Sequence, residues 1–372
     1  MNGLALKERI LHDTHSKQQC IDFWTKDARY ESTILKSVSK TDCVFESGAR
    51  PIKKIDILLI TGFSLVTLAS IVEPLCAANE VSDRTRFNLR LVTPEPGDVQ
   101  ASSGLGIGGV TSVSSLTRDI MLGIAPDLLI ICGGAGVPMQ FQSGLIDLLR
   151  SCKRQKVSIA GMGNAAWLLA EAGVLSDGAC ALHWKSRAAF LELHHEIAAE
   201  NVLFVKSGPI TCCGGELAAF DFIIDYIAEI CGPQIARKIC QHFLIVHCRD
   251  GDTRQPSPGN HVTNCNHNLD QMVELMAQNL EEPLSIDHIA DAVSLSRRQV
   301  ERTFSKYTST TPGRFYKGLR MQKARQLIEQ TTMSIIEIAV ACGFASTSHF
   351  AASFKSEYGV GPLEMRKLRK QA

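Results

Sequence analysis

The chain has no long hydrophobic run. Although 45% of its 372 residues are hydrophobic, no stretch of about 18 uninterrupted apolar residues occurs, so the sequence predicts no membrane-spanning helix and no membrane partner. The first residues also lack the order of basic and then apolar residues that is typical of a secretory signal. We therefore expect a cytoplasmic protein that is long enough to bury two hydrophobic cores.

Cysteine spacings typical of zinc sites or redox motifs are also missing. The thirteen cysteines are odd in number and contain no CxxC pair, and Cys212 and Cys213 are adjacent, which disfavours a bridge between them. Reduced thiols in a cytoplasmic protein fit this pattern best, and redox sensing is the alternative. His194, His195 and Glu196 lie in a charged stretch that predicts a solvated helical face rather than a metal site. We expect no metal and no cofactor.

Charge is almost balanced over the whole chain but not along it. The chain carries a net charge of +1, whereas residues 297–372 contain 14 Lys and Arg against 5 Asp and Glu, a net of +9. The preceding residues must therefore carry a net charge of about −8. Such a basic C-terminal region can supply the salt-dependent attraction to nucleic acid phosphates.

A helical unit occurs twice in the last hundred or so residues. In each copy, apolar residues keep helical spacing on both sides of a short turn, so that two helices can pack and leave a polar face on the second. The aligned pairs are Ile289 with Ile338, Val300 with Phe350, Phe304 with Phe354 and Pro312 with Pro362, an offset of about 50 residues. We interpret the region as a duplicated helix-turn-helix.

The second helix of such a unit can lie in a DNA major groove, where Arg can donate two hydrogen bonds to guanine. An ordinary helical hairpin with a solvated charged face is the alternative, but the duplication favours DNA binding. Ala351 and Ala352 predict weaker base recognition by the second copy. The candidate DNA-contacting residues are Ser296, Arg297, Arg298, Glu301 and Arg302 in the first copy and Thr347, Ser348 and His349 in the second.

The segment between the copies predicts a long helix over residues 312–330. Pro312 suits a first helical turn, and an apolar stripe follows. Nineteen helical residues span roughly 28 Å, comparable to the ~34 Å between successive major-groove faces on one side of DNA. One chain could therefore contact two adjacent groove segments. The stripe consists of Phe315, Leu319, Ala324, Leu327 and Ile328.

Residues 268–369 resemble the DNA-binding domain of the AraC/XylS transcriptional regulators. The resemblance implies promoter DNA and RNA polymerase as partners, a homodimer, and activation as the commoner outcome, with repression as the alternative. The matching residues are Arg320, Ala324 and Leu327 in the connecting helix and Gly343, Phe344, Phe350, Phe354, Gly359 and Pro362 in the second copy.

Upstream of the repeat, short apolar runs alternate with helical patterns. This order predicts an α/β domain with a flavodoxin-like, mainly parallel sheet, in which ligands bind at the carboxyl ends of the strands. We expect an extension over residues 1–50, this sensor domain over 51–249, a turn-rich linker over 250–267 and the all-α DNA-binding domain over 268–372. The expected strands are 55–60, 89–93, 128–132, 157–160 and 202–205, and the expected helices are 65–79, 145–150, 165–172 and 218–230.

Two of these strands end in glycine turns. One runs into Gly133 and Gly134, whose backbone N–H groups could face an anion or a carboxylate. The other runs into residues 161–164, a tight strand-to-helix turn of the kind that holds a nucleophile in hydrolases. The alternative for both is a turn needed only for chain reversal.

The motifs of residues 52–372 resemble the GlxA family of regulators, in which a PfpI/ThiJ, class I glutamine amidotransferase-like domain precedes an AraC-type domain. The Gly-Gly pair after Thr211 resembles regulators of arginine, carnitine and glycine-betaine catabolism, which implies an amino acid or a quaternary amine as the effector. The matching segments are residues 63–79, 132–134, 161–175, 183–184 and 211–215.

The departures from that family's enzymes predict an inactive site. Gly163 stands where catalytic relatives carry Cys, and Thr67 stands where an acidic residue often lies, so the nucleophile that covalent catalysis needs is missing. His183 is equally suited to a structural role against Trp184, and Glu73 could simply bond to backbone groups. The candidate ligand-binding residues are Glu73, Gly133, Gly134, Met162, Gly163, Asn164 and His183.

These observations together predict a transcriptional regulator that is not an enzyme. In this interpretation a small metabolite binds the inactive domain and shifts the population of arrangements that are competent to bind DNA. The first alternative is a PfpI-like enzyme, a hydrolase or lyase, with an appended DNA-binding tail. A ligand-independent nucleoid or interaction protein is the second.

Overall fold

A computed structural model describes residues 51–82, 86–108, 111–134, 137, 143–175, 178–256 and 266–371. The extension expected over residues 1–50 and residues 257–265 of the expected linker lie outside the described residues. Within the described part, no helix combines the length and apolar character needed to cross a membrane.

A seven-stranded sheet forms the centre of the first domain, in the order β10-β11-β7-β6-β1-β2-β5. The β10–β11 pair is antiparallel, and the other neighbours are parallel. The expected mainly parallel sheet is therefore confirmed. The strands are β1 (Lys53–Leu59), β2 (Phe87–Thr93), β5 (Thr111–Ser112), β6 (Leu128–Gly133), β7 (Ser158–Gly163), β10 (Phe204–Ser207) and β11 (Ile210–Cys213). Two small sheets pair β3 (Asp98–Gln100) with β4 (Gly106–Gly108) and β8 (Cys180–Ala181) with β9 (Ala199–Glu200).

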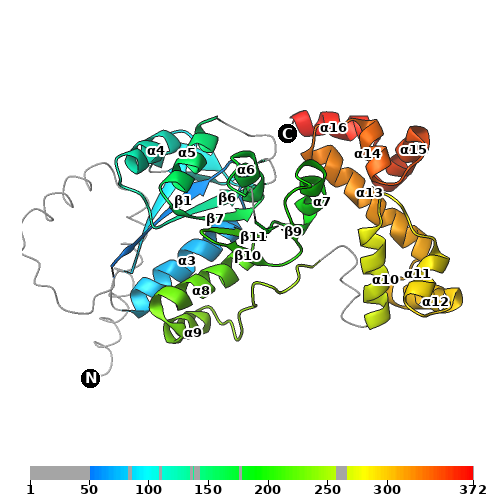
Figure 1. Ribbon diagram of the computed structural model, residues 1–372, viewed down its shortest axis with the longest axis horizontal. Coiled ribbons are helices and arrows are strands. Elements are labelled where there is room, and N and C mark those ends of the chain that lie inside the picture. The colour runs from blue at the N-terminus through cyan, green and yellow to red at the C-terminus, as the bar shows by residue number, and fades with distance from the viewer. Residues whose placement is uncertain are drawn as a thin grey trace, which may run out of the picture. The chain divides into compact units, whose positions relative to one another are not determined.

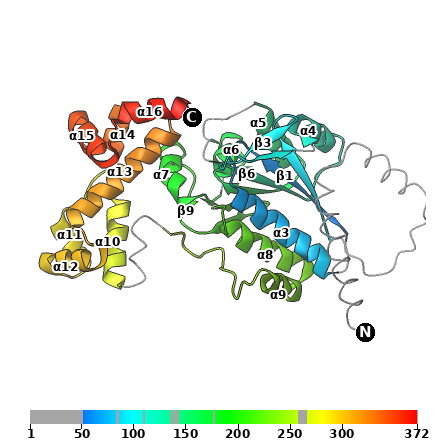
Figure 2. The same ribbon diagram turned by 180° about the vertical axis from the view of Figure 1, so that it is seen from behind.

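Helices cover both faces of this sheet. Figures 1 and 2 show α3, α8 and α9 on one face and α4, α5 and α6 on the other. The buried residues of the central strands are accordingly mostly apolar, as is usual for parallel strands covered on both faces. The helices are α3 (Leu65–Val81), α4 (Val113–Met121), α5 (Ser143–Arg154), α6 (Ala165–Glu171), α7 (Trp184–Leu193), α8 (Ala218–Cys231) and α9 (Pro233–His242).

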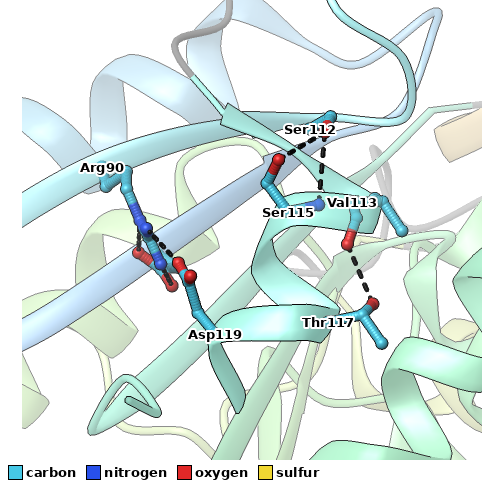
Figure 3. A network of polar contacts seen from close by, with 7 residues as sticks. Arg90, Ser112, Val113, Ser115, Thr117 and Asp119 are labelled. Carbon is cyan, nitrogen blue, oxygen red and sulfur yellow. Dashed lines mark hydrogen bonds and ion pairs between the residues drawn. The ribbon is translucent and has the colours of Figure 1, made fainter. Parts of the chain in front are cut away.

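A buried carboxylate ties two strands to one helix. Asp56 of β1 is 3% exposed and accepts two hydrogen bonds of 2.8 Å from Arg90 of β2. Figure 3 shows that Arg90 also bonds Asp119 of α4, at 2.9 Å. The hydrogen bonds and charges of Asp56 and Asp119 raise the pKa of Arg90 against the opposing effect of burial. The same figure shows Ser112 accepting from the Ser115 N–H to cap α4. Pairing of this kind is what allows a charge to remain in the core.

One expectation about local structure was wrong. His194, His195 and Glu196 do not lie on a helix, because α7 ends at Leu193 and His194 is its C-cap with φ −130°. The Glu196 carboxylate instead lies 3.6 Å from Nδ1 of His194 and 3.8 Å from Nδ1 of His195. The three residues form a turn before β9.

The C-terminal region contains two helix-turn-helix units around one connecting helix, α13. In the first unit, Val300 and Phe304 pack against α13 residues Tyr316 and Leu319. Farther along, α13 buries Ala324 and other apolar residues in the second unit's core. The helices are α10 (His267–Gln278), α11 (Ile286–Ala292), α12 (Arg297–Thr308), α13 (Pro312–Gln330), α14 (Ile335–Ala341), α15 (Thr347–Tyr358) and α16 (Pro362–Gln371).

The structure gives a role to Arg320 of α13, which is one residue of the family pattern. Its guanidinium donates to the carbonyl oxygens of Cys342 at 2.7 Å and Gly343 at 2.6 Å and stacks over the Phe344 ring at 4.1 Å. Because these carbonyls end α14, a cation there satisfies acceptors that the helix leaves open. Arg320 therefore fixes the turn of the second unit.

Candidate sensor pocket and nucleic-acid interface

A cavity of about 830 Å³ opens at the carboxyl ends of β1, β6, β7 and β11, which is the usual place for a ligand in a parallel sheet. The loops that follow these strands supply most of its wall, and the start of α7 supplies another part. Residues of α13, including Arg314, Gln322 and Gln326, also line it. The lining residues from the sheet side are Gly62, Ser64, Thr67, Gly133, Gly134, Gly163, Asn164, His183, Lys185, Ser186, Gly214, Gly215 and Glu216.

The strand-to-helix elbow at Gly163 keeps the backbone geometry of a nucleophile turn without the nucleophile. Gly163 has φ +64°, and a Cβ at this position would lie 2.7 Å from the carbonyl oxygen of Gly133. A side chain here would therefore be strained and would collide with backbone. At Gly133, Gly134 and Gly163 the cavity is therefore lined by peptide groups.

The nearest thiols cannot take over the nucleophile's role. Cys132 of β6 and Cys213 of β11 lie on the two strands that flank β7, but they are 1% and 0% exposed. Burial raises the pKa of each to about 12. Both thiols are therefore protonated at neutral pH and poorly reactive.

Glu216 is the main pocket residue that the sequence did not suggest. It has φ +50°, its N–H donates to Thr67 Oγ1 at 2.7 Å, and its carboxylate accepts from the Ser64 hydroxyl at 2.7 Å. A residue other than Gly held in the left-handed region is uncommon and marks functional positions. The signal in the sequence was an acid placed directly after Gly214 and Gly215.

Asn164 lines the cavity and carries an unused acceptor. It precedes α6 at the N-cap position but makes no capping bond with its side chain. It is 5% exposed, and its Oδ1 has no hydrogen-bond partner among the described residues. Because an unpaired buried acceptor costs about 1–3 kcal/mol, this atom is suited to meet a donor on a ligand.

His183 also lines the cavity and carries a donor. Its Nδ1 accepts from the Lys185 N–H at 3.3 Å, which leaves the proton of the neutral ring on Nε2. The ring stacks on Trp184 with centroids 5.6 Å apart. Burial lowers the pKa of His183, Lys185 lowers it further, and Glu216 opposes them. The imidazole is therefore neutral at pH 7.

The structure brings together five of the seven residues expected to bind ligand. Gly133, Gly134, Gly163, Asn164 and His183 all line the cavity.

The other two lie elsewhere. The Met162 side chain is 0% exposed in the core, because alternate residues of a strand point to opposite faces. Glu73 lies on the exposed face of α3, away from the cavity lining. Neither residue contacts the cavity.

Gln255 fastens the segment after the first domain to the back of the pocket wall. Its Nε2 donates to the carbonyl oxygens of Leu182 at 2.9 Å and Val202 at 2.6 Å, and its Oε1 accepts from the Trp184 N–H at 3.0 Å. The side chain is 4% exposed. Residues 250–255, which the sequence placed in the linker, are therefore bonded to the sensor domain.

The first helix-turn-helix unit presents two unpaired arginines. Arg298 and Arg302 lie one turn apart on the exposed side of α12, and neither makes an ion pair or side-chain hydrogen bond with a described residue. Arg297 differs, because it pairs with Asp287 and Glu301 at 3.2 Å each. Two arginines of this face are therefore available to contact DNA, whereas the third is already ion-paired within the protein.

The other expected DNA-contacting residues are exposed as well. Ser296 caps α12 in a capping box with Gln299, so its hydroxyl is already engaged. Thr347, Ser348 and His349 open α15 and are all exposed, and the His349 ring lies 5.5 Å from that of Phe344. The second helix thus offers shorter polar groups than the first.

The parallel sheet with a nucleophile-free elbow and the tandem helix-turn-helix units define the class of one-component transcriptional regulators. Residues 53–229 match the DJ-1/PfpI family and residues 289–368 match a helix-turn-helix domain. The chain is 35% identical over 319 residues to the HTH-type transcriptional regulator GbdR of Pseudomonas aeruginosa, covering 85% of this chain and 84% of that one. It is 30% identical over 326 residues to the HTH-type transcriptional regulator GlxA of Rhizobium meliloti, covering 86% and 98%. An AraC family transcriptional regulator from Pseudomonas putida is 22% identical with a TM-score of 0.46, covering 51% of this chain and 99% of that structure.

The chain therefore belongs to the family of HTH-type transcriptional regulators in which a DJ-1/PfpI domain precedes an AraC-type DNA-binding domain. Its DJ-1/PfpI domain is a sensing domain, and its helical region binds DNA.

Proposed function

We propose that this regulator binds a small polar metabolite in the cavity at the Gly163 elbow and changes promoter activity in response, without catalysing a reaction. The observation that carries the proposal is the elbow itself, where Gly163 replaces a nucleophile and the Gly133 carbonyl fills the space of a Cβ. An enzyme of the PfpI kind would need an activated nucleophile at this turn. The cavity instead offers groups suited to reversible binding.

These groups favour an effector that carries a hydrogen-bond donor. Asn164 Oδ1 and the Glu216 carboxylate are acceptors, the second with a negative charge, while His183 Nε2 is a donor. A protonated amine can donate to Asn164 and meet the charge of Glu216, and a carboxylate can accept from His183. A quaternary amine has no N–H, so it would leave Asn164 Oδ1 unpaired. We therefore favour an amino acid over a quaternary amine.

The coupling route we propose runs through α6 and α7. Trp167 of α6 packs edge-on against Phe190 of α7 at 5.2 Å, and Glu192 at the end of α7 pairs with Lys323 of α13 at 2.6 Å. Gln330 of α13 also donates to the Lys185 carbonyl at 3.3 Å. A ligand that favours one position of α7 would therefore change the position of the helix that joins both DNA-binding units.

We further propose that the protein acts as a cytoplasmic homodimer, and that it activates transcription together with RNA polymerase at its promoter. The support is the resemblance of residues 268–369 to AraC-type activators.

A methylation series tests the proposed effector chemistry. Glycine, sarcosine, dimethylglycine and glycine betaine share a carboxylate but lose N–H donors in turn, and thermal shift of the purified protein reports binding to the native state. We expect the thermal shift to fall as methyl groups are added. In Asn164→Ala the four compounds should give similar shifts. Asn88→Ala, which changes an exposed asparagine of β2 outside the cavity, is the control and should keep the series. A largest shift with glycine betaine would contradict the donor requirement.

A promoter-reporter assay tests regulation itself. Any ligand that stabilises the protein should change reporter output in wild type, and the change should be lost when Glu216 is replaced by Gln. Binding without any change in output would contradict the sensing role.

A further inference from the structure

Two thiols at the end of the sensor domain lie almost in contact. The Sγ atoms of Cys240 and Cys248 are 3.3 Å apart, and a disulfide bond is about 2.05 Å long. Both residues are partly exposed, so small solutes can reach them. They differ in this respect from the buried cysteines of the described residues, which are Cys132, Cys152, Cys180, Cys212, Cys213 and Cys342.

A chain reversal at the end of α9 creates this proximity. Leu244 adopts φ +58°, its N–H donates to the Gln241 carbonyl at 3.1 Å, and the Ile245 N–H donates to the Cys240 carbonyl at 2.8 Å. This pair of bonds is the Schellman motif that ends many helices. It turns the chain back, so that residue 248 returns to the side of residue 240.

Contacts of the adjoining residues fix the chain at both cysteines, so their proximity does not depend on a bond between them. The Arg249 N–H and guanidinium bond the buried Asp221 carboxylate of α8 at 2.9 Å and 2.6 Å, which fixes the chain next to Cys248. On the other side, Ile239 is 0% exposed and anchors α9 next to Cys240. The short sulfur–sulfur distance is therefore a property of the fold.

We propose that Cys240 and Cys248 form a redox-active pair that closes to an intrachain disulfide on oxidation by a peroxide. One thiolate attacks a peroxide oxygen, the O–O bond breaks, and a sulfenic acid forms as the first water leaves. The second thiol then attacks the sulfenic sulfur, so that the S–S bond forms, the S–O bond breaks and the second water leaves. Two thiols and one hydrogen peroxide thus give one disulfide and two waters, and the sulfurs lose the two electrons that the peroxide gains.

The position of the pair gives the bond a structural consequence. Cys248 begins the segment that continues through Arg249 to Gln255 on the pocket wall, so the disulfide ties the start of that segment to α9. Burial, the Cys240 thiol and Asp221 raise the pKa of Cys248, while Arg249 opposes them. Cys248 therefore stays largely a thiol at neutral pH, and its reaction through the thiolate becomes faster as the pH rises.

Peptide mass mapping tests the proposal directly. Lys238 and Arg249 flank the pair, so trypsin leaves both cysteines in the single peptide 239–249. The reduced full chain is treated with hydrogen peroxide at mildly alkaline pH, alkylated and digested without reductant. We expect that peptide to escape alkylation and to be about 2 Da lighter than the reduced, unalkylated peptide. Treatment with dithiothreitol should restore alkylation at both cysteines. Cys248→Ser should abolish the change, whereas Cys231→Ser, a partly exposed cysteine at the end of α8, should keep it.

Three results would contradict the proposal that these cysteines form a redox-active pair. They are alkylation of both thiols after oxidation, a cross-link from either cysteine to another one, and conversion to sulfinic acid without a disulfide. Because the readout is the mass of one peptide, it is independent of effector binding and of DNA binding.

Discussion

The side-chain amide of Gln255 donates to the Leu182 carbonyl at 2.9 Å, immediately before the residue that caps α7 and lines the sensor cavity. The segment that leads towards the DNA-binding domain is thus hydrogen-bonded to the wall of the cavity. The wall and the segment cannot move independently while this bond and its companions at Val202 and Trp184 persist.

Gln255→Leu should weaken both the fold and the response. The substitution keeps a similar volume but leaves two buried carbonyls and one N–H without their partner, and each such loss costs about 1–3 kcal/mol. We expect a lower melting temperature of the purified protein and a reduced effector response in a promoter-reporter assay. Gln241→Leu, at an exposed position of α9, is the control. Equal melting temperatures for the two variants would show that the Gln255 hydrogen bonds do not contribute measurably to stability.

Arg302 should matter more for DNA binding than Arg297. The guanidinium of Arg302 is unpaired and exposed, so it is free to bond a base edge, and Arg302→Ala should weaken binding by about 1–3 kcal/mol. Arg297 is already held by Asp287 and Glu301, so Arg297→Ala should cost less. Gel-shift titrations on the same promoter fragment compare the two, with Arg237→Ala on α9 as the control. A larger effect of Arg297→Ala would reverse this ranking.

The two halves of the binding site should contribute unequally. Arg298 and Arg302 lie on the first recognition helix, whereas Ser348 and Ala352 occupy the aligned positions of the second. Scrambling the DNA segment that α12 binds should therefore reduce affinity more than scrambling the segment that α15 binds, as measured by gel shift. Equal or opposite effects would show that Thr347, Ser348 and His349 carry the recognition.

Regular patterns made the architecture predictable from the sequence. The helical periods around Val300 and Phe350 predicted both units, and the apolar runs predicted the central strands. The missed elements include the strand at Ile210–Cys213 and the helix at Trp184–Leu193, as well as α4, α9 and β5. The first is a run of four residues that only its neighbours in the sheet identify as a strand, and the second has no strong amphipathic period.

The pocket was less predictable than the fold. Glycines at the strand ends marked its floor, because peptide groups approach closely there. Glu216 and Gln255 were missed because each acts through partners far away in the sequence, Ser64 and Thr67 for the first and Leu182 for the second. Glu73 was favoured by a family motif, but the helical phase of α3 turns it to solvent.

His183 should make stability depend on acid pH. Its pKa is lowered by burial and by Lys185, so between the lowered pKa and the unfolded value of about 6.5 the unfolded state binds more protons than the folded state. Stability should therefore fall as the pH drops below about 6.5. Melting temperatures measured from pH 8 down to about pH 5 should decline less steeply in His183→Gln than in wild type. Parallel curves would show that His183 is not the group that titrates.

The last prediction concerns Gly163 and compares two glycines. Gly163 and Gly173 have φ of +64° and +68°, but a Cβ at Gly163 would meet the Gly133 carbonyl at 2.7 Å, whereas nothing lies within 4 Å of one at Gly173. Both Ala variants should lose about 1 kcal/mol from the backbone conformation, while only Gly163→Ala disturbs the cavity floor. We expect Gly163→Ala to weaken the effector response and Gly163→Leu to abolish it, with effector-free DNA binding intact, and Gly173→Ala to respond as wild type.

Circular dichroism and gel shift of the same Gly163 variants test whether the fold and effector-free DNA binding are intact. If both are intact, a lost response comes from the cavity and not from misfolding. The wild-type protein should also show no esterase, amidase or glyoxalase-type turnover, because the elbow holds no nucleophile and the adjoining Cys132 and Cys213 are buried thiols. Measurable turnover, or a normal effector response from Gly163→Leu, would contradict a catalytically silent sensor. An equal loss of response in Gly173→Ala would instead assign the effect to backbone strain, since the two glycines share that strain and differ in their distance from the Gly133 carbonyl.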